Sequence, residues 1–356
     1  MNIGRQSPLV LLASVVLLAA CGGSSTPAPA PTPTATPVPS PPPTSKVVLG
    51  YFVDSSSASS LGIYSGYLNA VSADVFTVQS DGGIAGNVPT DLVTFDANNG
   101  IKTYACVSNT VSGTFDANLA HEAIVTSRTQ TVQSLVAVAR SGGFVGVNID
   151  FESLNVADRA AFSAFIAELG TALHAQSLKL VISVAAKEND DPSNKYAYPF
   201  DYAAIGGSAD LIQLMTYDQH GTWSAPGPVA GRDWMERCIV FAKSKIPAAK
   251  LLVGLPAYGY DWDLDNTAFN QAFAWNYVPT LLSGTGASVQ YQQSSDSPYI
   301  NYTDAVGHRH QSWFENTQSI SIKSALVKKY GLAGLAMWRL GDDDLSFWTA
   351  TRAGVD

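Results

Sequence analysis

Polar and apolar side chains alternate along residues 146–152, where Asn148, Asp150 and Glu152 are each separated by one apolar residue. A period of two predicts a β-strand with two unlike faces. If both faces are buried, the apolar face packs under helices and the other carries an amide and two carboxylates into the interior. Burying a carboxylate is costly unless it is hydrogen-bonded or used in chemistry, so this row predicts a functional site. The alternative is an amphipathic edge strand with solvated acidic side chains.

Two carboxyl groups at one strand end are suited to general acid–base chemistry. Glu152 is the natural acid, because burial and the nearby charge of Asp150 both favour its protonated form. Asp150 lies two residues earlier on the same face, so it is poorly placed to attack a substrate from the side opposite Glu152. We therefore assign the proton donor to Glu152 and do not assign the nucleophile to Asp150.

Short apolar runs recur between helix-like stretches throughout residues 46–356. Strands that alternate with helices favour a parallel sheet, and the length and order predict an α/β fold, a (β/α)8 or TIM barrel. Residues 262–312 are rich in Tyr, Ser, Asn and Gln and too long for a loop, which predicts a small α+β insertion between strands seven and eight. The eight candidate strands are Val47–Val53, Asp74–Val78, Ile101–Val107, Phe144–Phe151, Lys179–Ala185, Leu211–Tyr217, Leu251–Ala257 and Leu332–Trp338.

Polar or aromatic side chains stand at the ends of most of these candidate strands. Active sites of TIM barrels lie at the carboxyl ends of the strands. Each residue alone could be an ordinary loop residue, but their recurrence at one end of successive strands predicts one shared cleft. The residues are Asp54, Ser108, Asn109, Asp150, Glu152, Lys187, Glu188, Tyr217, Asp218, Tyr258, Tyr260 and Trp338.

The N-terminus is typical of a targeting segment. Arg5 precedes the apolar stretch 9–20, which is too short to span a bilayer and indicates a secretory signal peptide. It ends in Leu18-Ala19-Ala20-Cys21, which resembles the bacterial lipobox and implies lipidation of Cys21. The alternative is an ordinary signal peptide with an incidental Cys.

Residues 22–45 are rich in Pro, a composition that cannot bury a core and favours an extended spacer. A Pro-rich ligand for a partner protein is the alternative. We therefore expect three parts, which are a lipoprotein signal peptide at 1–21, a linker at 22–45 and a barrel at 46–356.

The composition limits the partners. A formal net charge of −9 argues against nucleic acid. Of five scattered histidines only His308 and His310 lie close together; we expect these two on a loop, and we predict no metal site and no cofactor. Cys106 and Cys238 have apolar neighbours, which predicts buried thiols, with a single bridge between them as the alternative.

Four motifs, in order along the chain, resemble those of glycoside hydrolase family 18. Residues 145–152 are similar to its strand-four signature, Asp-x-x-Asp-x-Asp-x-Glu, and residues 213–218 match its strand-six pattern, Gln-x-Met-x-Tyr-Asp. Residues 255–259 resemble its strand seven, and Trp338 stands where the family places a Trp under the sugar. The resemblance extends over 46–356 and implies a TIM-barrel glycosidase.

Two residues depart from the strand-four signature. Val145 stands in place of its first Asp, and Asn148 in place of its second, which in this family exchanges a proton with the third. Asn148 can donate a hydrogen bond to Asp150 but cannot take over its charge or proton. The Asn at position 148 and the run Trp313–Asn316 are similar to residues found in the spore-cortex glucosaminidase branch of this family. The departures therefore indicate a subfamily and a changed pH profile, not a dead site.

The resemblance also implies a retaining mechanism in which the substrate's own 2-acetamido oxygen attacks the anomeric carbon. Asp150 would orient the acetamido N–H, and Tyr217 would donate its hydroxyl to the acetamido oxygen. Without an N-acetyl group there is no nucleophile, so the implied substrate is an N-acetylglucosamine-containing polysaccharide or oligosaccharide with β-1,4 bonds. The expected substrate-binding residues are Asn148, Gln213, Asp218, Trp338, Tyr258, Tyr260, Asn109 and Asp54.

These expectations describe an exported, monomeric glycosidase held by a lipid in the bacterial cell envelope, at the outer membrane or cell surface. Chitin, peptidoglycan and an acetylated exopolysaccharide stay open as substrates. The main alternative is the same fold used as a lectin, against which the retention of Glu152, Asp150 and Tyr217 argues. A structural envelope protein is a further alternative, but it would not explain the polar strand ends.

Overall fold

The computed structural model describes residues 44–356. The predicted signal peptide, Cys21 and the linker up to residue 43 lie outside the described residues. Among residues 44–356, no helix combines the length and apolar composition that crossing a membrane requires.

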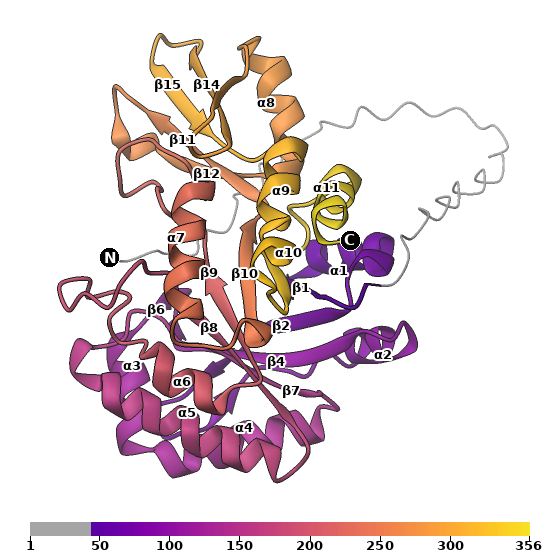
Figure 1. The fold of residues 1–356 in the computed structure, drawn as a ribbon, viewed down its shortest axis with the longest axis vertical. Helices are drawn as coiled ribbons and strands as arrows, with labels where there is room; N and C mark the ends of the chain where they lie inside the picture. Colours follow the sequence, from indigo (N-terminus) through magenta and orange to yellow (C-terminus); the bar gives the residue numbers. More distant parts are fainter. Residues whose placement is uncertain (1–43) are drawn as a thin grey trace, which may run out of the picture.

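Eight parallel strands close into a barrel (Figure 1). Each strand pairs with the next in the order below, and the last returns to the first with Gly334 opposite Val47. The short strand β3 (Ile84–Ala85) pairs antiparallel with β2 outside the closed ring. The (β/α)8 prediction is confirmed. The barrel strands are β1 (Val47–Phe52), β2 (Ala70–Val78), β4 (Lys102–Ser108), β7 (Gly146–Asp150), β8 (Lys179–Ala185), β9 (Leu211–Met215), β10 (Leu251–Pro256) and β16 (Gly334–Trp338).

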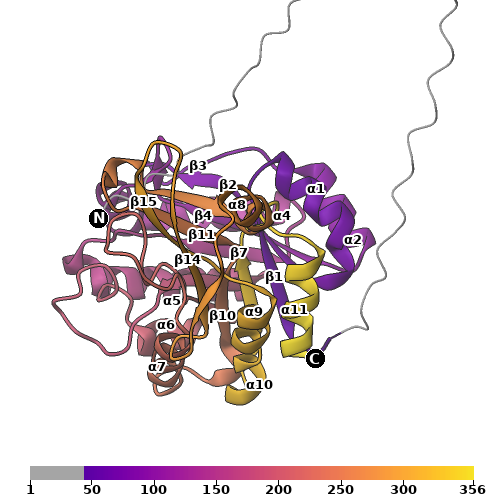
Figure 2. The ribbon, with the colours of Figure 1, turned by 90° about the horizontal axis from the view of Figure 1, so that it is seen from above.

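Helices surround the strands when the molecule is seen from above (Figure 2). The helix after β7 buries five apolar side chains completely, and each such burial stabilises the fold by roughly 1.5–3 kcal/mol. The helices of this ring are α1 (Ser55–Tyr64), α2 (Thr90–Asn98), α3 (Ala117–His121), α4 (Arg128–Ser141), α5 (Arg159–His174), α6 (Tyr202–Ser208), α7 (Arg232–Lys243), α9 (Thr317–Ser324), α10 (Leu326–Tyr330) and α11 (Leu345–Val355).

Short elements join these parts. They are the strands β5 (Thr110–Val111) and β6 (Thr114–Phe115), the π-helical turn Glu122–Thr126, and 3₁₀ turns at Ser65–Tyr67, Val156–Asp158, Ala248–Lys250, Thr267–Phe269 and Trp275–Tyr277.

The insertion between β10 and β16 is a second, five-stranded sheet with one helix, at one end of the molecule (Figure 1). It begins at Tyr258, four residues before the predicted boundary, because a single residue, Ala257, separates the end of β10 from the start of β11. Its elements are β11 (Tyr258–Asp263), β12 (Gln271–Ala274), α8 (Val278–Thr285), β13 (Gln290–Gln292), β14 (Ser297–Thr303) and β15 (Arg309–Trp313).

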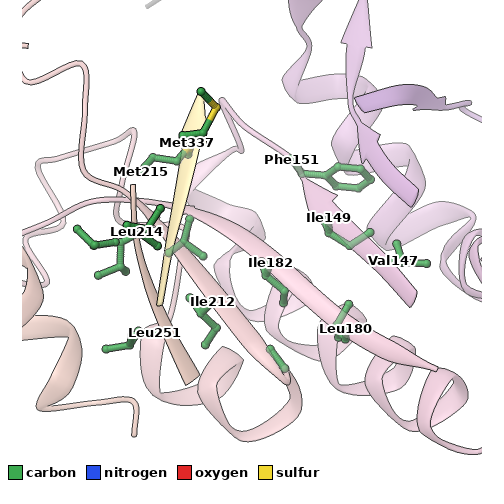
Figure 3. Packing of buried hydrophobic residues seen from close by; sticks show 14 of the residues in the cluster. Val147, Ile149, Phe151, Leu180, Ile182, Ile212, Leu214, Met215, Leu251 and Met337 are labelled. Atoms are coloured by element: carbon green, nitrogen blue, oxygen red, sulfur yellow. The ribbon is translucent and has the colours of Figure 1, made fainter. Parts of the chain in front are cut away.

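Both faces of β7 are buried, as the alternation along 146–152 predicts. β7 lies between β4 and β8, so it is not an edge strand. Val147, Ile149 and Phe151 are fully buried in the apolar cluster that the helices cover (Figure 3). Asn148 and Asp150 occupy the opposite face, which is the barrel interior. Gly146 permits the close approach of β8, because a Cβ there would lie 2.0 Å from the carbonyl oxygen of Lys179.

The barrel interior is layered. Its lower part is an apolar cluster from alternate strand positions, which includes Leu49, Tyr104, Val181, Leu252 and Ala336. Polar side chains follow towards the carboxyl ends of the strands. The interior is therefore a packed core whose upper layers carry the polar groups.

The two cysteines and the two neighbouring histidines of the composition analysis have definite places. Cys106 on β4 and Cys238 in α7 are buried and are not joined by a disulfide, so the prediction of buried thiols is confirmed. The loop prediction is wrong for His310, which lies within β15 and whose Nδ1 is 2.7 Å from Asp261 Oδ2. His308 precedes β15, with Nδ1 2.6 Å from Asp263 Oδ2.

Candidate active site

Glu152 lies two residues past the end of β7 and is held through its backbone. The Glu152 N–H donates to Asn109 Oδ1 at 2.8 Å, and Asn109 Nδ2 donates to the Glu152 carbonyl at 2.9 Å. Asn109 is fully buried just after β4, so its amide fixes the main chain of Glu152 from the neighbouring strand. Ser153 then takes a left-handed conformation, with φ of 54°, and turns the chain away.

The side chain of Glu152 is half-buried and accepts a hydrogen bond from a neighbouring loop. Tyr196, in the long loop after β8, donates its hydroxyl to Glu152 Oε2 at 2.7 Å. Burial, with a further contribution from the Glu152 carboxylate, raises the pKa of Tyr196 well above its usual range. The phenol therefore stays protonated and acts as a hydrogen-bond donor. No sequence motif points to Tyr196, because it belongs to a loop.

Asp150 ends β7 with an exposed fraction of 4%. One of its carboxylate oxygens, Sγ of Cys106 and one oxygen of Asp74 on β2 all lie within 4.8 Å of one another. Carboxylate and sulfur donors at this spacing could hold a metal ion, whereas the sequence motifs indicated none. Asp74 and Cys106 are buried interior residues that the sequence did not indicate as site residues.

Asn148 is fully buried below Asp150 and belongs to a hydrogen-bonded layer. Its Nδ2 donates to the Tyr51 hydroxyl at 2.9 Å and to Ser72 Oγ at 2.8 Å, while Ser183 Oγ donates to its Oδ1 at 3.3 Å. Both amide hydrogens are thus used within the barrel. The structure places Asn148 as a connector between strands and not at a surface that a sugar could touch.

Tyr217 follows β9 and stands at the upper end of the same layer. Tyr51 donates to Gln213 Oε1 at 3.2 Å, and Gln213 Nε2 donates to the Tyr217 oxygen at 3.1 Å. Gln213 is fully buried, so it contacts Tyr217 from the barrel interior. Because the phenol oxygen accepts from Gln213, its own hydrogen is oriented for donation elsewhere.

The charges of Asp150 and Glu152 both act on this phenol. Burial raises the pKa of Tyr217 well above its usual range, and both carboxylates raise it further. Tyr217 is therefore a neutral donor at physiological pH. Gly254 on β10 makes room for it, because a Cβ there would lie 2.8 Å from the Tyr217 ring and 2.5 Å from the Leu214 carbonyl oxygen. No sequence argument identified this requirement.

Asp218 is oriented by two tyrosines of the insertion. Tyr258 and Tyr260 donate to its Oδ1 at 2.6 and 2.8 Å. The residue has a left-handed backbone conformation, with a φ of 59°. Burial raises the pKa of Asp218, and the two tyrosine hydrogen bonds partly oppose this. The insertion thus contacts the barrel rim at this predicted site residue.

Trp338, at the end of β16, packs its ring against Tyr51 with centroids 5.3 Å apart. It is half-buried and also borders the aromatic cluster formed by Tyr258, Tyr260 and Trp262. Aromatic faces of this kind suit the apolar faces of sugars.

Asp54, after β1, makes contacts that stabilise the fold around it. It caps α1 by accepting from Ser56 N and Ser57 N, and it pairs with Arg339 at 2.7 Å. Burial would raise the pKa of Asp54, but the bonds from Arg339 and Ser56 lower it to about 2. Its ion pair holds the residue that follows Trp338.

Lys187 and Glu188, after β8, form ion pairs instead of joining the group around Glu152. Lys187 is buried and lies 2.7 Å from Asp190, whereas Glu188 is exposed and lies 2.6 Å from Arg237. Of the polar residues predicted at the strand ends, Lys187 and Glu188 therefore have structural ion pairs and do not join the candidate site.

A closed (β/α)8 barrel with a positioned glutamate, a paired aspartate, a donor tyrosine and an aromatic wall defines a glycosidase. Residues 47–343 match the family model described as Glycosyl hydrolases family 18. The chain therefore belongs to glycoside hydrolase family 18, and both the family prediction and the enzyme class are confirmed.

Known proteins similar to this chain agree with that assignment. "Uncharacterized glycosylase YvbX" of Bacillus subtilis (strain 168) is 37% identical over 314 residues, covering 87% of this chain and 91% of its own. The "Cortical fragment-lytic enzyme" of the same organism is 29% identical, covering 77% of this chain and 65% of its own. The crystal structure of a chitinase from Chromobacterium violaceum ATCC 12472 superposes with a TM-score of 0.84 at 38% identity, covering 87% of this chain and 98% of that one.

Proposed function

We propose that this protein cleaves β-1,4 bonds in N-acetylglucosamine-containing glycans, with chitin oligomers and peptidoglycan as the two candidate substrates. The observation that carries the proposal is the convergence of Glu152, Asp150 and Tyr217 at the strand ends, with Glu152 held by Asn109. The names of the similar proteins, a chitinase and a cortical fragment-lytic enzyme, support the same substrate class.

In the first step, Glu152 transfers its proton to the glycosidic oxygen as the bond from that oxygen to the anomeric carbon breaks. The acetamido oxygen of the same sugar forms a new bond to the anomeric carbon and gives an oxazolinium ion. Asp150 accepts a hydrogen bond from the acetamido N–H, and Tyr217 donates its hydroxyl to the acetamido oxygen. These fixed groups stabilise charge where it develops.

In the second step, water attacks the anomeric carbon and the bond to the acetamido oxygen breaks. Glu152, now a carboxylate, accepts the proton of that water and is ready for another cycle. Two displacements on opposite faces retain the configuration. Trp338 supports the sugar from its apolar face, and Asp218 is available to hydroxyl groups on the other side.

We also propose export and lipid anchoring through Cys21, with the linker 22–45 separating a monomeric barrel from the membrane. The run Leu18-Ala19-Ala20-Cys21 supports this. The test is metabolic labelling with a tagged fatty acid in a bacterial host. Label should enter the wild type and be absent from Cys21→Ala. Label in both proteins would contradict the assignment of Cys21.

The substrate proposal is tested with the purified full chain in mild detergent. N-acetylglucosamine oligomers, their deacetylated counterparts and purified peptidoglycan are each incubated with it, and the products are followed by mass spectrometry. Acetylated substrates should be cleaved, with retained configuration in the first product, and deacetylated ones should not. Comparable rates on both would exclude the acetamido group as nucleophile, and binding without cleavage would favour a lectin.

A further inference from the structure

Asp74 is a buried carboxylate beside the proposed catalytic residues. It lies on β2 with an exposed fraction of 5%. Its backbone is opposite Cys106 of β4, which is in turn opposite Asn148 of β7. Ser72, two residues earlier on β2, points into the interior, because its hydroxyl accepts from Asn148. Side chains alternate along a strand, so Asp74 points to the same side.

Asp74 and Asp150 approach each other within this interior. One oxygen of each carboxyl group and Sγ of Cys106 lie within 4.8 Å of one another, and Asp150 is also almost fully buried. Two ionised carboxylates at this separation repel strongly where water screens poorly. The pair therefore retains one proton and titrates as a unit.

Residue 148 on β7 is an asparagine, so this position has no group that can exchange a proton with Asp150. Its two amide hydrogens are donated to Tyr51 and Ser72, and its oxygen accepts from Ser183. A side-chain amide neither takes up nor releases a proton in this range. A second carboxyl group for Asp150 is nevertheless present, supplied by β2 from across the neighbouring strand.

We propose that Asp74 is a positioning residue that exchanges a proton with Asp150 during turnover, an inference that rests on the proposed function. In the free enzyme the proton of the pair is on Asp150, and Asp74 carries the negative charge. When the acetamido group enters, the proton moves from Asp150 Oδ to Asp74 Oδ. Asp150 becomes the anion that accepts the acetamido N–H and faces the oxazolinium charge. The pair keeps one proton and one negative charge throughout.

Other titratable groups lie near this pair. Burial raises the pKa values of Tyr51, Tyr196 and Tyr217 well above their usual range, so these phenols stay neutral through the acid range. These groups include Tyr51 from β1, Cys106 from β4, Glu152 after β7, Tyr196 after β8, and Tyr217 and Asp218 after β9. A substitution at Asp74 leaves all of them in place, so it isolates the contribution of the second carboxyl group.

The first test is the pH dependence of kcat and kcat/KM on an N-acetylglucosamine oligomer, for the full chain and its Asp74→Asn variant. We expect kcat to fall about tenfold or more, and the acid limb of kcat/KM to move up by about one pH unit. The reason is that Asp150 must then ionise beside an amide instead of sharing its proton with a carboxyl group. Asp96→Asn is the matched control, because Asp96 is a fully buried acid that contacts Thr103 from α2. Its pH profile of activity should equal that of the wild type.

A rescue variant separates proton exchange from a merely structural role. Asp74→Asn combined with Asn148→Asp moves the carboxyl group from β2 to β7. Ser72 and Ser183 can then donate their hydroxyl hydrogens to residue 148, while Tyr51 still donates to Gln213, so the polar layer keeps donors for its acceptors. The double variant should recover most of kcat and return the acid limb towards the wild-type position. No recovery in a folded double variant would contradict proton exchange.

An infrared measurement needs no activity. At pH 7 the wild type should show a protonated carboxyl band that Asp74→Asn lacks. In the variant only Asp150 of the pair remains, and it is ionised at this pH. If Asp74→Asn cleaves the glycan with the same infrared band and pH profile as the wild type, the Asp74 proposal is overturned and the proposed function stands. A band that the wild type shows and Asp74→Asn lacks, in a wild type that cleaves no glycan, would support the shared proton and remove the proposed function. Stoichiometric metal in the wild type that Asp74→Asn loses would overturn the proposal in favour of a metal site.

Discussion

Tyr196 donates its hydroxyl to Glu152 Oε2 at 2.7 Å, and the two residues come from loops after different barrel strands. Glu152 is fixed by β7 and by Asn109, whereas Tyr196 belongs to the long segment between β8 and α6. A donor at this oxygen favours the carboxylate form over the acid form. The loop after β8 therefore influences the protonation of the proposed acid directly.

Removal of that donor should change the pH profile in one direction. Tyr196→Phe keeps the ring but loses the hydrogen bond, so the acid form of Glu152 should persist to higher pH. We expect the basic limb of kcat/KM to move up, with less than about a tenfold change in rate at the optimum. Tyr198→Phe is the control in the same loop, because the ring of Tyr198 contacts Arg159 and is retained. A basic limb that stays in place or moves down in Tyr196→Phe would contradict this role.

Asn109 should matter for both stability and rate, since it binds the backbone of Glu152 twice. Asn109→Ala leaves a buried N–H and carbonyl without partners, which should cost about 1–3 kcal/mol in the free energy of unfolding. A misplaced Glu152 should also lower kcat by about tenfold or more. Denaturant unfolding and steady-state kinetics measure the two effects. Asn155→Ala, at an exposed position, should change neither, and an equally small effect at Asn109 would rule out its positioning role.

Tyr217→Phe should lower kcat by about 10–10² while changing KM little, because the lost donor acts mainly on charge that develops in the transition state. The ring still packs against Tyr258, with centroids 6.3 Å apart. Tyr330→Phe, on α10, is the control and should retain full kcat. A Tyr217→Phe enzyme with normal kcat and raised KM would indicate simple ground-state binding instead.

Asp96 provides a test of stability against pH that is independent of catalysis. Burial raises its pKa to about 6, and the bond from Thr103 only partly opposes this. Because the folded pKa lies above the unfolded value, the contribution of this group is fully present below about pH 4 and is lost as pH rises through about 6.

Asp96→Asn removes this titration. The difference in unfolding free energy, variant minus wild type, should therefore rise by about 2–3 kcal/mol between pH 4 and pH 8. Urea unfolding at a series of pH values measures it. A difference that is constant with pH would show that Asp96 titrates alike in both states.

Much of the barrel could be predicted from sequence because its strands are short apolar runs between helical segments. β8 was predicted with both correct ends, and the other barrel strands lie close to their predicted ranges. The start of β2 was missed, since Ala70, Ser72 and Ala73 are small or polar and lack the bulk that marks a strand. β-Pairing with β1 and β4 decides that segment, and such long-range contacts leave no local signal.

The site was predictable where its residues end consecutive strands. Glu152, Asp150, Tyr217 and Trp338 stood in motifs or at strand ends. Asp74 and Tyr196 did not, because one is an interior residue of a weakly patterned strand and the other lies in a loop. The hydrogen-bond partners of Asn148 could not be predicted from the sequence either, since its amide could equally have pointed to Asp150. Only the closed barrel brings Tyr51 and Ser72 beside it.

The most direct test of the account is the turnover of Glu152→Gln on N-acetylglucosamine oligomers, compared with Glu168→Gln on the exposed face of α5. Glutamine keeps the shape and the backbone contacts with Asn109 but cannot donate the proton, so kcat should fall by about 10²–10⁴ or more. Thermal unfolding and oligomer binding should match those of the wild type, and Glu168→Gln should retain full activity. A folded Glu152→Gln protein with near-normal kcat would contradict the central claim that Glu152 is the general acid.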